Sequence, residues 1–359
     1  MGILRFLLAL AVLLYHMSGF ALFGMSLGEL MIRPIDGKPA VEAFFIISGF
    51  AMAGALSTRY RDGPVGRFYM SRVLRLYPAY LLLLALEIVA AAAIWQSTRP
   101  QPADLWIAYA GQPLADRLLW LSSNLAIVGK ELWFQGDLFP RQFVNPAWSL
   151  SIELQFYVLI PFVVGWPVRR LVALLVAALA YRIVLFADFG GVPPAYYSLP
   201  WHLCLFLLGV LSYRLLGHWQ SVSLKAALGP AVALMVLTVL FPHYTEGDSR
   251  ADWLKLGYWL ALFLTLPLLS RLSEENRIDA FLGDLSYPIY LANLGVIYTV
   301  TSLQPALRLD AWAAVAATVG ATLAIAVLVV LAIDRPMTHL RRALAARRRA
   351  SLAAAGALT

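Results

Sequence analysis

The chain has 359 residues, of which 61% are hydrophobic and 13% charged, and its formal net charge is +8 at pH 7. Soluble domains are about 45–50% apolar, so this composition excludes an ordinary soluble protein and indicates a membrane protein. No soluble module with interleaved basic and aromatic residues is present, and we expect no nucleic-acid partner. The single cysteine, Cys204, excludes an intrachain disulfide and a multi-cysteine metal site.

Apolar runs of roughly 17 to 23 residues recur along the chain, and each is long enough to cross a bilayer as a helix. In chain order they are 3–23, 40–57, 76–95, 148–165, 168–186, 199–216, 224–241, 253–270, 284–303 and 311–333. The sequence therefore predicts an all-α, polytopic membrane helix bundle with about ten transmembrane helices. Residues 1–336 form the membrane-embedded domain. Residues 337–359 form a basic cytoplasmic tail, an interfacial helix followed by disorder.

The basic residues predict the orientation of this bundle. With an even number of spans, the arginine-rich connections fall on the same side as both ends of the chain. The positive-inside rule then places both termini in the cytoplasm. The long outer connection 96–145 is expected to contain a re-entrant or interfacial helix that lies over the bundle.

Five arginines precede the third predicted span in one short inner loop: Arg59, Arg61, Arg67, Arg72 and Arg75. Such a cluster has two interpretations. It can be an orientation signal that touches anionic lipid headgroups, or it can hold a phosphorylated ligand from the cytoplasm. From the residues alone the first interpretation is favoured.

Ionisable side chains inside the spans are the informative residues, because a charged group there costs about 2.5 to 3.5 kcal/mol on the insertion scale. They are His16, Glu42, Glu87 and Glu153. Arg5 and His16 are eleven residues apart, which places both on one helix face about 16 Å apart along its axis. Glu87 has no obvious partner and is interpreted as structural. The alternative for His16 is a histidine bonded to a backbone carbonyl.

Depth counting places His16, Glu42 and Glu153 in the outer half of the membrane, where they can meet, and Asn293 at the depth of His16. One face of the fourth span carries, at positions i, i+4 and i+8, Ser149, Glu153 and Tyr157. A carboxylate beside a histidine holds one tautomer and makes the ring more basic, as a general base acting on a hydroxyl requires. The alternative is a structural ion pair or polar layer.

Five segments carry a resemblance to a known family. They are Arg5 and His16 separated by ten residues, VEAFFIISGF at 41–50, RVLRLYPAY at 72–80, WSLSIELQFY at 148–157 and LGDLSYPIYL at 282–291. In this order they resemble the membrane acyltransferase-3 family of multi-pass bacterial enzymes that O-acylate surface and secreted glycans. The resemblance implies a protein of the bacterial inner membrane.

The resemblance also implies the donor side of a site. An acyl-CoA, most simply acetyl-CoA, is then a co-substrate from the cytoplasm, with no bound cofactor and no metal. Its phosphates contact Arg5, Arg72 and Arg75, and Tyr77 lies near the donor path. The resemblance thereby favours the ligand-binding interpretation of the basic loop.

On the acceptor side, the resemblance makes His16 the base on an acceptor hydroxyl or a transient acyl carrier, with Glu42 orienting its ring. Glu153 completes the catalytic set. The acceptor, a surface glycan or its lipid-linked precursor, then meets Trp148, Ser149, Tyr157 and Asn293.

Three departures from the family pattern qualify these roles. Glu42 stands where relatives usually have Asp, and Asn293 where they often have His. The chain also stops soon after Pro336 where many relatives continue into an outer domain, so an accessory periplasmic protein or a homo-oligomer stays open. The rival class is a secondary transporter or a lipid or glycan flippase. Concentration of the polar residues in the first, second and fourth spans favours an enzyme.

Overall fold

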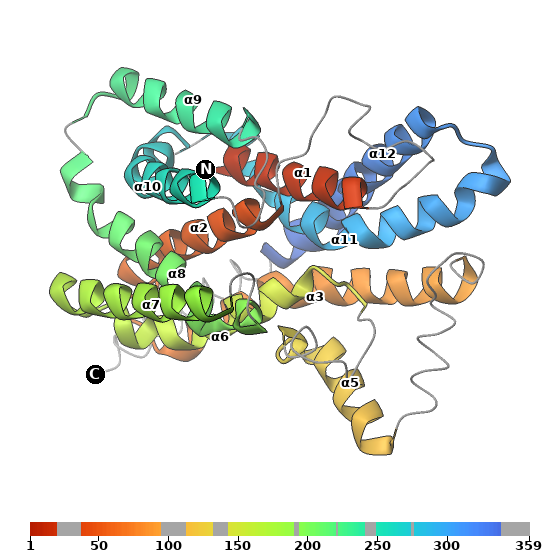
Figure 1. Cartoon of the computed structure of the whole chain (residues 1–359), viewed down its shortest axis with the longest axis horizontal. Helices are drawn as coiled ribbons and strands as arrows, with labels where there is room; N and C mark the ends of the chain where they lie inside the picture. Colours follow the sequence, from red (N-terminus) through yellow and green to blue (C-terminus); the bar gives the residue numbers. More distant parts are fainter. Residues whose placement is uncertain are drawn as a thin grey trace, which may run out of the picture.

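The computed structural model describes residues 1–19, 37–94, 113–131, 143–189, 194–219, 222–240, 249–273 and 276–338. These ranges are helical and contain no strand, which confirms the all-α class for them. The helices shown in Figure 1 are α1 (Gly2–Gly19), α2 (Gly37–Ser57), α3 (Val65–Ala93), α5 (Leu114–Ala126), α6 (Ala147–Val163), α7 (Val168–Phe189), α8 (Leu199–Arg214), α9 (Leu224–Leu240), α10 (Ser249–Leu272), α11 (Arg277–Leu307) and α12 (Ala311–Val329). Three short elements accompany them, η4 (Pro194–Tyr197), η5 (Leu216–Trp219) and the π-helical η6 (Val330–Asp334).

Several of these helices suit a bilayer. In the described residues α2, α3, α11 and the helix that begins with α12 are long and apolar enough to cross a membrane, and α1, α6, α8 and α9 contain shorter apolar segments. This supports a helical membrane protein. The count of ten spans and the orientation stay predictions. The predicted tail falls largely in residues 339–359, outside the described ranges.

The third helix begins earlier than the sequence predicts. α3 starts at Val65, directly after Pro64, and continues to Ala93. Proline suits the start of a helix, and Arg67, Met70, Arg72, Leu74 and Arg75 have high helix propensity. Arg67, Arg72 and Arg75 therefore lie on a helix and not in a loop, so their directions are fixed relative to the bundle.

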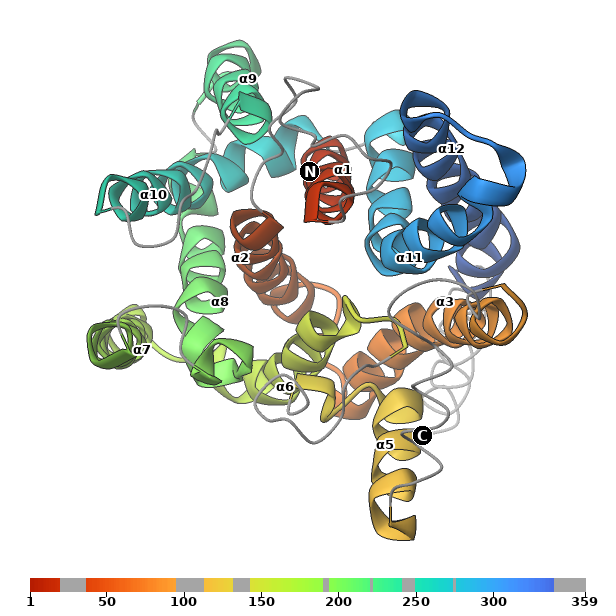
Figure 2. The same ribbon diagram turned by 45° about the vertical axis from the view of Figure 1, so that its right-hand side comes forward.

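α1 and α2 lie in the middle of the bundle, with the other helices around them (Figure 2). Two glycines allow close packing of α2 against α8. A Cβ on Gly49 would lie 2.0 Å from the carbonyl oxygen of Phe206, and one on Gly209 would lie 1.9 Å from that of Ile46. Only glycine permits this approach of the two backbones.

α1 and α11 pack side by side and begin at the same end of the bundle. The backbone N–H groups of Gly2 and Ile3 donate to the carboxylate of Asp279 at 2.7 and 2.9 Å. Asp279 thus caps the first turn of α1, where the helix has free N–H groups. Because the two helices run parallel, residues near the end of α1 lie beside the second half of α11.

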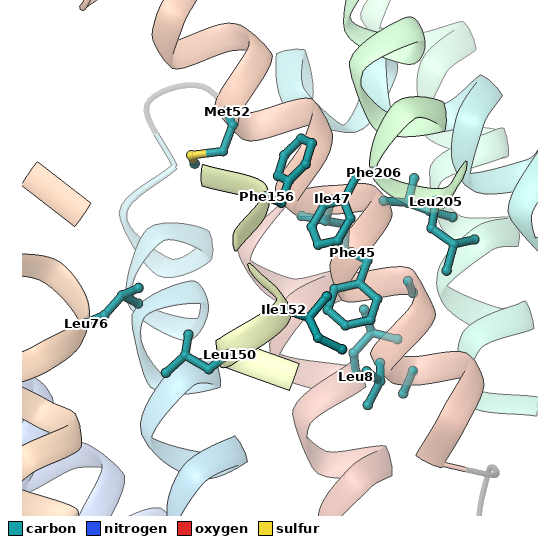
Figure 3. Close-up of a cluster of buried hydrophobic side chains, with 14 of the residues drawn as sticks. Leu8, Phe45, Ile47, Met52, Leu76, Leu150, Ile152, Phe156, Leu205 and Phe206 are labelled. Carbon is teal, nitrogen blue, oxygen red and sulfur yellow. The ribbon is translucent and has the colours of Figure 1, made fainter. Parts of the chain in front are cut away.

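Aromatic and aliphatic side chains fill the space between α2, α6 and α8, as Figure 3 shows. The ring of Phe156 stacks on that of Phe206 with centroids 4.1 Å apart, and Phe45 packs against Phe206 at 4.8 Å. These residues are almost completely buried. The packed cluster fixes the faces that α2 and α6 present elsewhere.

The connection 96–145 contains a helix, as expected, but α5 does not lie over the bundle. It leaves the bundle at a steep angle to α3 (Figures 1 and 2). Its C-terminal end is held by the hydroxyls of Tyr77 and Tyr80, which donate to the carbonyls of Ala126 and Asn124. The leucines of α5 are mostly exposed, as in a helix whose apolar side meets lipid. Residues 95–112 and 132–142 of this connection lie outside the described ranges.

Candidate active site

A cavity of about 460 Å³ lies between α1, α2, α3, α6 and α11. On α2 its lining extends from Val41 to Ala55, a rise of about 21 Å along the helix axis. The cavity therefore runs through much of the bundle. Its polar lining consists of Arg5, Arg72, Arg75, Ser48, Ser149, Ser286, Tyr157, Tyr287, Tyr290, Glu153, Asp279 and Asp284.

The three arginines predicted on the donor side all line this cavity. Arg5 is near the start of α1, whereas Arg72 and Arg75 are three residues apart on α3 and share a face. None of them forms a salt bridge among the described residues, and the buried Nε of Arg72 has no hydrogen-bond partner there. Guanidinium groups that face a cavity without a salt-bridge partner provide a site for an anion such as a phosphate.

Glu153 of α6 is held in the cavity wall by two hydroxyl groups. Ser48 Oγ donates to Glu153 Oε1 at 2.5 Å, and the hydroxyl of Tyr157 donates to the same oxygen. Ser149, one turn earlier on α6, lies 2.8 Å from the hydroxyl of Tyr290. The spacing of Ser149, Glu153 and Tyr157 predicts one shared face, and in the structure all three residues line the cavity.

His16 is paired with Asn293 of α11. Nδ1 of His16 lies 2.7 Å from Oδ1 of Asn293, and Nδ2 of Asn293 donates to the carbonyl of Tyr290 at 2.6 Å. The Tyr290 carbonyl can only accept a hydrogen bond, so it takes one from the NH2 group of Asn293. The amide oxygen of Asn293 therefore faces the ring of His16, and Nδ1 of the ring carries the proton. Nε2 then keeps the lone pair that a base or nucleophile needs.

The His16 pair lies just beyond the described lining of the cavity. Tyr290 lines the cavity, and Asn293 is about one helical turn further along α11. Arg5 and His16 thus lie on one helix, α1, which packs beside the part of α11 that carries Tyr290 and Asn293.

Glu42 does not pair with His16, which corrects the expected orientation of the ring by this carboxylate. Glu42 Oε1 accepts from Arg182 Nη2 at 2.5 Å, and Oε2 accepts from Trp259 Nε1 at 3.1 Å. The cavity face of α2 includes Val41, and Glu42 is turned about 100° from it. The carboxylate therefore faces α7 and α10.

Two further predicted residues lie outside the cavity lining. Tyr77 faces the end of α5, where its hydroxyl binds the carbonyl of Ala126. Trp148, next to Ser149, packs against Tyr197 with centroids 4.9 Å apart and T-shaped rings. The structure thus brings together Arg5, Arg72, Arg75, Ser149, Glu153 and Tyr157, and places Tyr77 and Trp148 at the edge of this group.

Several polar residues of the bundle were not among the predicted site residues. Tyr287 and Tyr290 are three residues apart within the segment 282–291, and this spacing could have placed them on one face. Arg182 and His202 fall inside predicted spans, so hydropathy alone could have singled them out. No group of three or more His, Cys, Asp and Glu that could hold a metal ion occurs within the described ranges.

A second group that was not predicted lies where the connection 96–145 meets the bundle. Lys130 Nζ donates to Asn124 Oδ1 at 2.8 Å and to the Phe143 carbonyl at 2.6 Å. Burial lowers the pKa of Lys130 to about 7, and the charge of Glu87 opposes the shift. Glu87 accepts from the Val144 N–H at 2.7 Å, so this carboxylate helps to anchor the connection.

Comparison with known proteins supplies the classification. Residues 1–331 match the acyltransferase-3 family, described as an acyltransferase domain. The chain belongs to this family. It is 29% identical over 270 residues to the putative membrane-bound transacylase BcsY of Komagataeibacter xylinus, covering 71% of this chain and 65% of that protein. No solved structure matches the chain.

A second relative is an O-acetyltransferase by name. The chain is 24% identical over 333 residues to the O-acetyltransferase OatA of Staphylococcus aureus, covering 83% of this chain and 50% of that protein. The chain thus spans between half and two thirds of the length of these relatives. The match to the family covers the cavity, the arginines and the His16 pair together.

Proposed function

We propose that this protein is an integral membrane O-acyltransferase, in the simplest case an O-acetyltransferase. It moves an acyl group from cytoplasmic acyl-CoA to a hydroxyl of a surface or secreted glycan or its lipid-linked precursor. The proposal is carried by the cavity that begins among Arg5, Arg72 and Arg75 and reaches Ser149 and Tyr290, one turn from Asn293. Membership of the family and the names of both relatives support it.

The donor would enter at the arginine end. Three guanidinium groups without salt-bridge partners among the described residues match the phosphates of coenzyme A in charge and in hydrogen-bonding geometry. The extended pantetheine arm would then follow the cavity, which continues for about 21 Å along α2. This brings the thioester toward His16.

At the far end, His16 supplies the reactive nitrogen. As a base, Nε2 takes the proton of the acceptor hydroxyl, the oxygen bonds to the thioester carbonyl carbon, the C–S bond breaks, and coenzyme A leaves as a thiolate that takes up a proton. As a carrier, Nε2 first bonds to the thioester carbonyl carbon, the C–S bond breaks and coenzyme A leaves as a thiolate. The acceptor oxygen then takes the acyl group as the bond to Nε2 breaks, and the hydroxyl proton goes to the thiolate. In both routes the bond from Nδ1 to Asn293 holds the ring. A thioester is already activated, so the proposed reaction uses neither a metal nor a bound cofactor.

This function places the protein in the bacterial inner membrane with about ten spans and both termini in the cytoplasm. Its partners are then the bilayer, the acyl-CoA and the glycan acceptor. A homo-oligomer or an accessory periplasmic protein would complete the system if the acceptor lies beyond the reach of the bundle.

The test compares cells with the gene, without it and with it restored. Purified surface glycans are examined by NMR for ester-bound acetyl groups, and consumption of acetyl-CoA is followed in isolated membranes. We expect the esters to disappear on deletion and to return on restoration. Unchanged ester content, together with solute movement that needs no acetyl-CoA, would instead support the transporter class.

A further inference from the structure

A group of buried polar and aromatic residues lies beside the cavity and has no role in the transfer described above. Arg182 of α7 is its centre. The guanidinium lies between the rings of Trp201 and Trp259, 4.8 Å from each centroid, and Nη2 donates to Glu42 at 2.5 Å. Together with His202, we refer to these residues as the His202 cluster.

The cluster concentrates polar atoms that lack hydrogen-bond partners. Arg182 Nη1, Trp201 Nε1 and both ring nitrogens of His202 are buried and have no partner among the described residues. These are four of the eight such side-chain atoms there. His202 is 0% and Trp201 3% exposed. Because buried polar groups are normally satisfied, four such atoms in one place point to a polar ligand group.

Aromatic rings surround the imidazole of His202. The ring centroids of Phe45, Tyr196 and Trp148 lie 4.6, 5.0 and 6.2 Å from it. Apolar faces on several sides, with hydrogen-bonding atoms between them, suit a ring that has C–H faces and polar edges.

The position of the cluster connects it to the proposed acceptor end. Glu42 is near the start of α2, His202 near the start of α8 and Trp148 at the start of α6. Phe45 lines the cavity and touches His202, and Ser149, next to Trp148, lines the cavity as well. Rotation of the Phe45 side chain would join the cluster to the cavity.

The charges select the class of ligand. The salt bridge to Glu42 neutralises Arg182, so the cluster has no excess positive charge to hold an anion. An acyl chain would leave all four atoms unsatisfied. A neutral, hydroxyl-rich ring can accept from Arg182 and Trp201 and can both donate to and accept from His202.

We propose that the His202 cluster is a subsite for one neutral sugar unit of the acceptor glycan. The proposal rests on the proposed acyltransferase function and names the class of its acceptor. The sugar ring packs against Trp148 and Tyr196, and its hydroxyls bind Arg182, Trp201 and His202. The acyl-accepting hydroxyl of the same or a neighbouring unit then reaches the cavity beside Phe45.

The test uses full-length protein reconstituted in vesicles, with acetyl-CoA and surface glycan freed of esters by mild base. Trp201→Phe removes one N–H and keeps an aromatic ring, and His202→Phe removes both nitrogens. Trp312→Phe, at a side chain of α12 that is 57% exposed, is the matched control. Thermal unfolding identifies any variant that fails to fold. If one of the two test variants fails to fold, the other still tests the subsite.

We expect Trp201→Phe and His202→Phe each to raise the KM for glycan at least fivefold and to change the KM for acetyl-CoA less than twofold. The control should change neither. An unchanged KM for glycan in both variants would overturn the subsite and leave buried water as the partner of these atoms. Equal rises of both KM values would show a structural role and overturn it too. Absence of transfer by the wild type would instead overturn the acyltransferase function itself.

Discussion

His16 is oriented by an amide and not by a carboxylate. Asn293 accepts the proton of Nδ1 and is itself fixed by the Tyr290 carbonyl, so the tautomer of the ring is set through two hydrogen bonds. An amide sets the tautomer without adding a charge to the membrane interior, where a charge is costly. In the proposed reaction, Asn293 therefore orients the ring through a hydrogen bond, without the negative charge that a carboxylate would place beside it.

Substitutions of Asn293 test whether this residue orients the His16 ring for the proposed transfer. Asn293→Ala removes the bond to Nδ1, so we expect kcat to fall about tenfold or more, because the ring can take the wrong tautomer. Asn293→Asp keeps an acceptor oxygen and should retain more activity than Asn293→Ala. The measurement is kcat for acetyl transfer at saturating acetyl-CoA. Equal losses in the two variants would contradict the orienting role.

Arg72 and Arg75 should act on the donor. Replacing either with Ala removes a guanidinium that has no salt bridge among the described residues, so we expect the KM for acetyl-CoA to rise about tenfold, near 1.4 kcal/mol. The KM for glycan should change little. Arg67→Ala is the control, because Arg67 is on the same helix but outside the cavity lining. A similar effect of all three substitutions would argue for general electrostatics.

At the scale of elements, backbone contacts between helices set the shape of the site. The glycine pair of α2 and α8 holds α2 at a fixed rotation, with Val41 and Ser48 toward the cavity and Glu42 toward Arg182. A change in that contact moves both the cavity and the His202 cluster. The cap on α1 by Asp279 similarly fixes the register of α1 against α11.

Gly49→Ala should therefore destabilise the protein. Its Cβ would meet backbone atoms of α8 at 2.0 Å, which no rotamer change relieves, and overpacking costs about 1–3 kcal/mol or more. We expect a clearly lower unfolding temperature in detergent, measured by the fluorescence of buried tryptophans. Gly320→Ala is the control, since nothing lies within 4 Å of its Cβ position. An unfolding temperature equal to that of the control would contradict the packing described here.

Helix faces could be predicted from the sequence, and contacts between helices could not. The spacing of Ser149, Glu153 and Tyr157 predicts a shared face because helical geometry is local, and all three residues line the cavity. Depth counting placed His16 and Asn293 at one level for the same reason. It also suggested that Glu42 reaches His16, but depth says nothing about rotation around the axis. That rotation is set by the contact of Gly49 with α8, which is not a local property.

For the whole molecule, the central question is which end of the cavity faces the cytoplasm. The arginines line the cavity beside the start of α1 and on α3, whereas Trp148 and the His202 cluster lie near the starts of α6 and α8. The proposed function needs the first end inside and the second outside. Cys204 is completely buried, so cysteines placed elsewhere can be labelled selectively.

Single cysteines at three exposed positions test this orientation. Gly66→Cys at the start of α3 and Gly165→Cys between α6 and α7 should react with a membrane-impermeant maleimide only in inverted vesicles. Leu307→Cys, at the end of α11 in a side chain that is 60% exposed, should react in intact cells. The expected pattern follows from the positive-inside rule. Labelling of all three from the same side would contradict the ten-span arrangement.

The most direct test of the account is acetyl transfer by His16→Ala in reconstituted vesicles. With labelled acetyl-CoA on the arginine side and de-esterified glycan on the other, the wild type should place label on the glycan. A positioned base or carrier contributes about 10²–10⁴-fold, so His16→Ala should lower kcat at least about a hundredfold while its unfolding temperature stays near that of the wild type. Transfer by a folded His16→Ala variant at close to the wild-type rate would contradict the claim that His16 carries the chemistry.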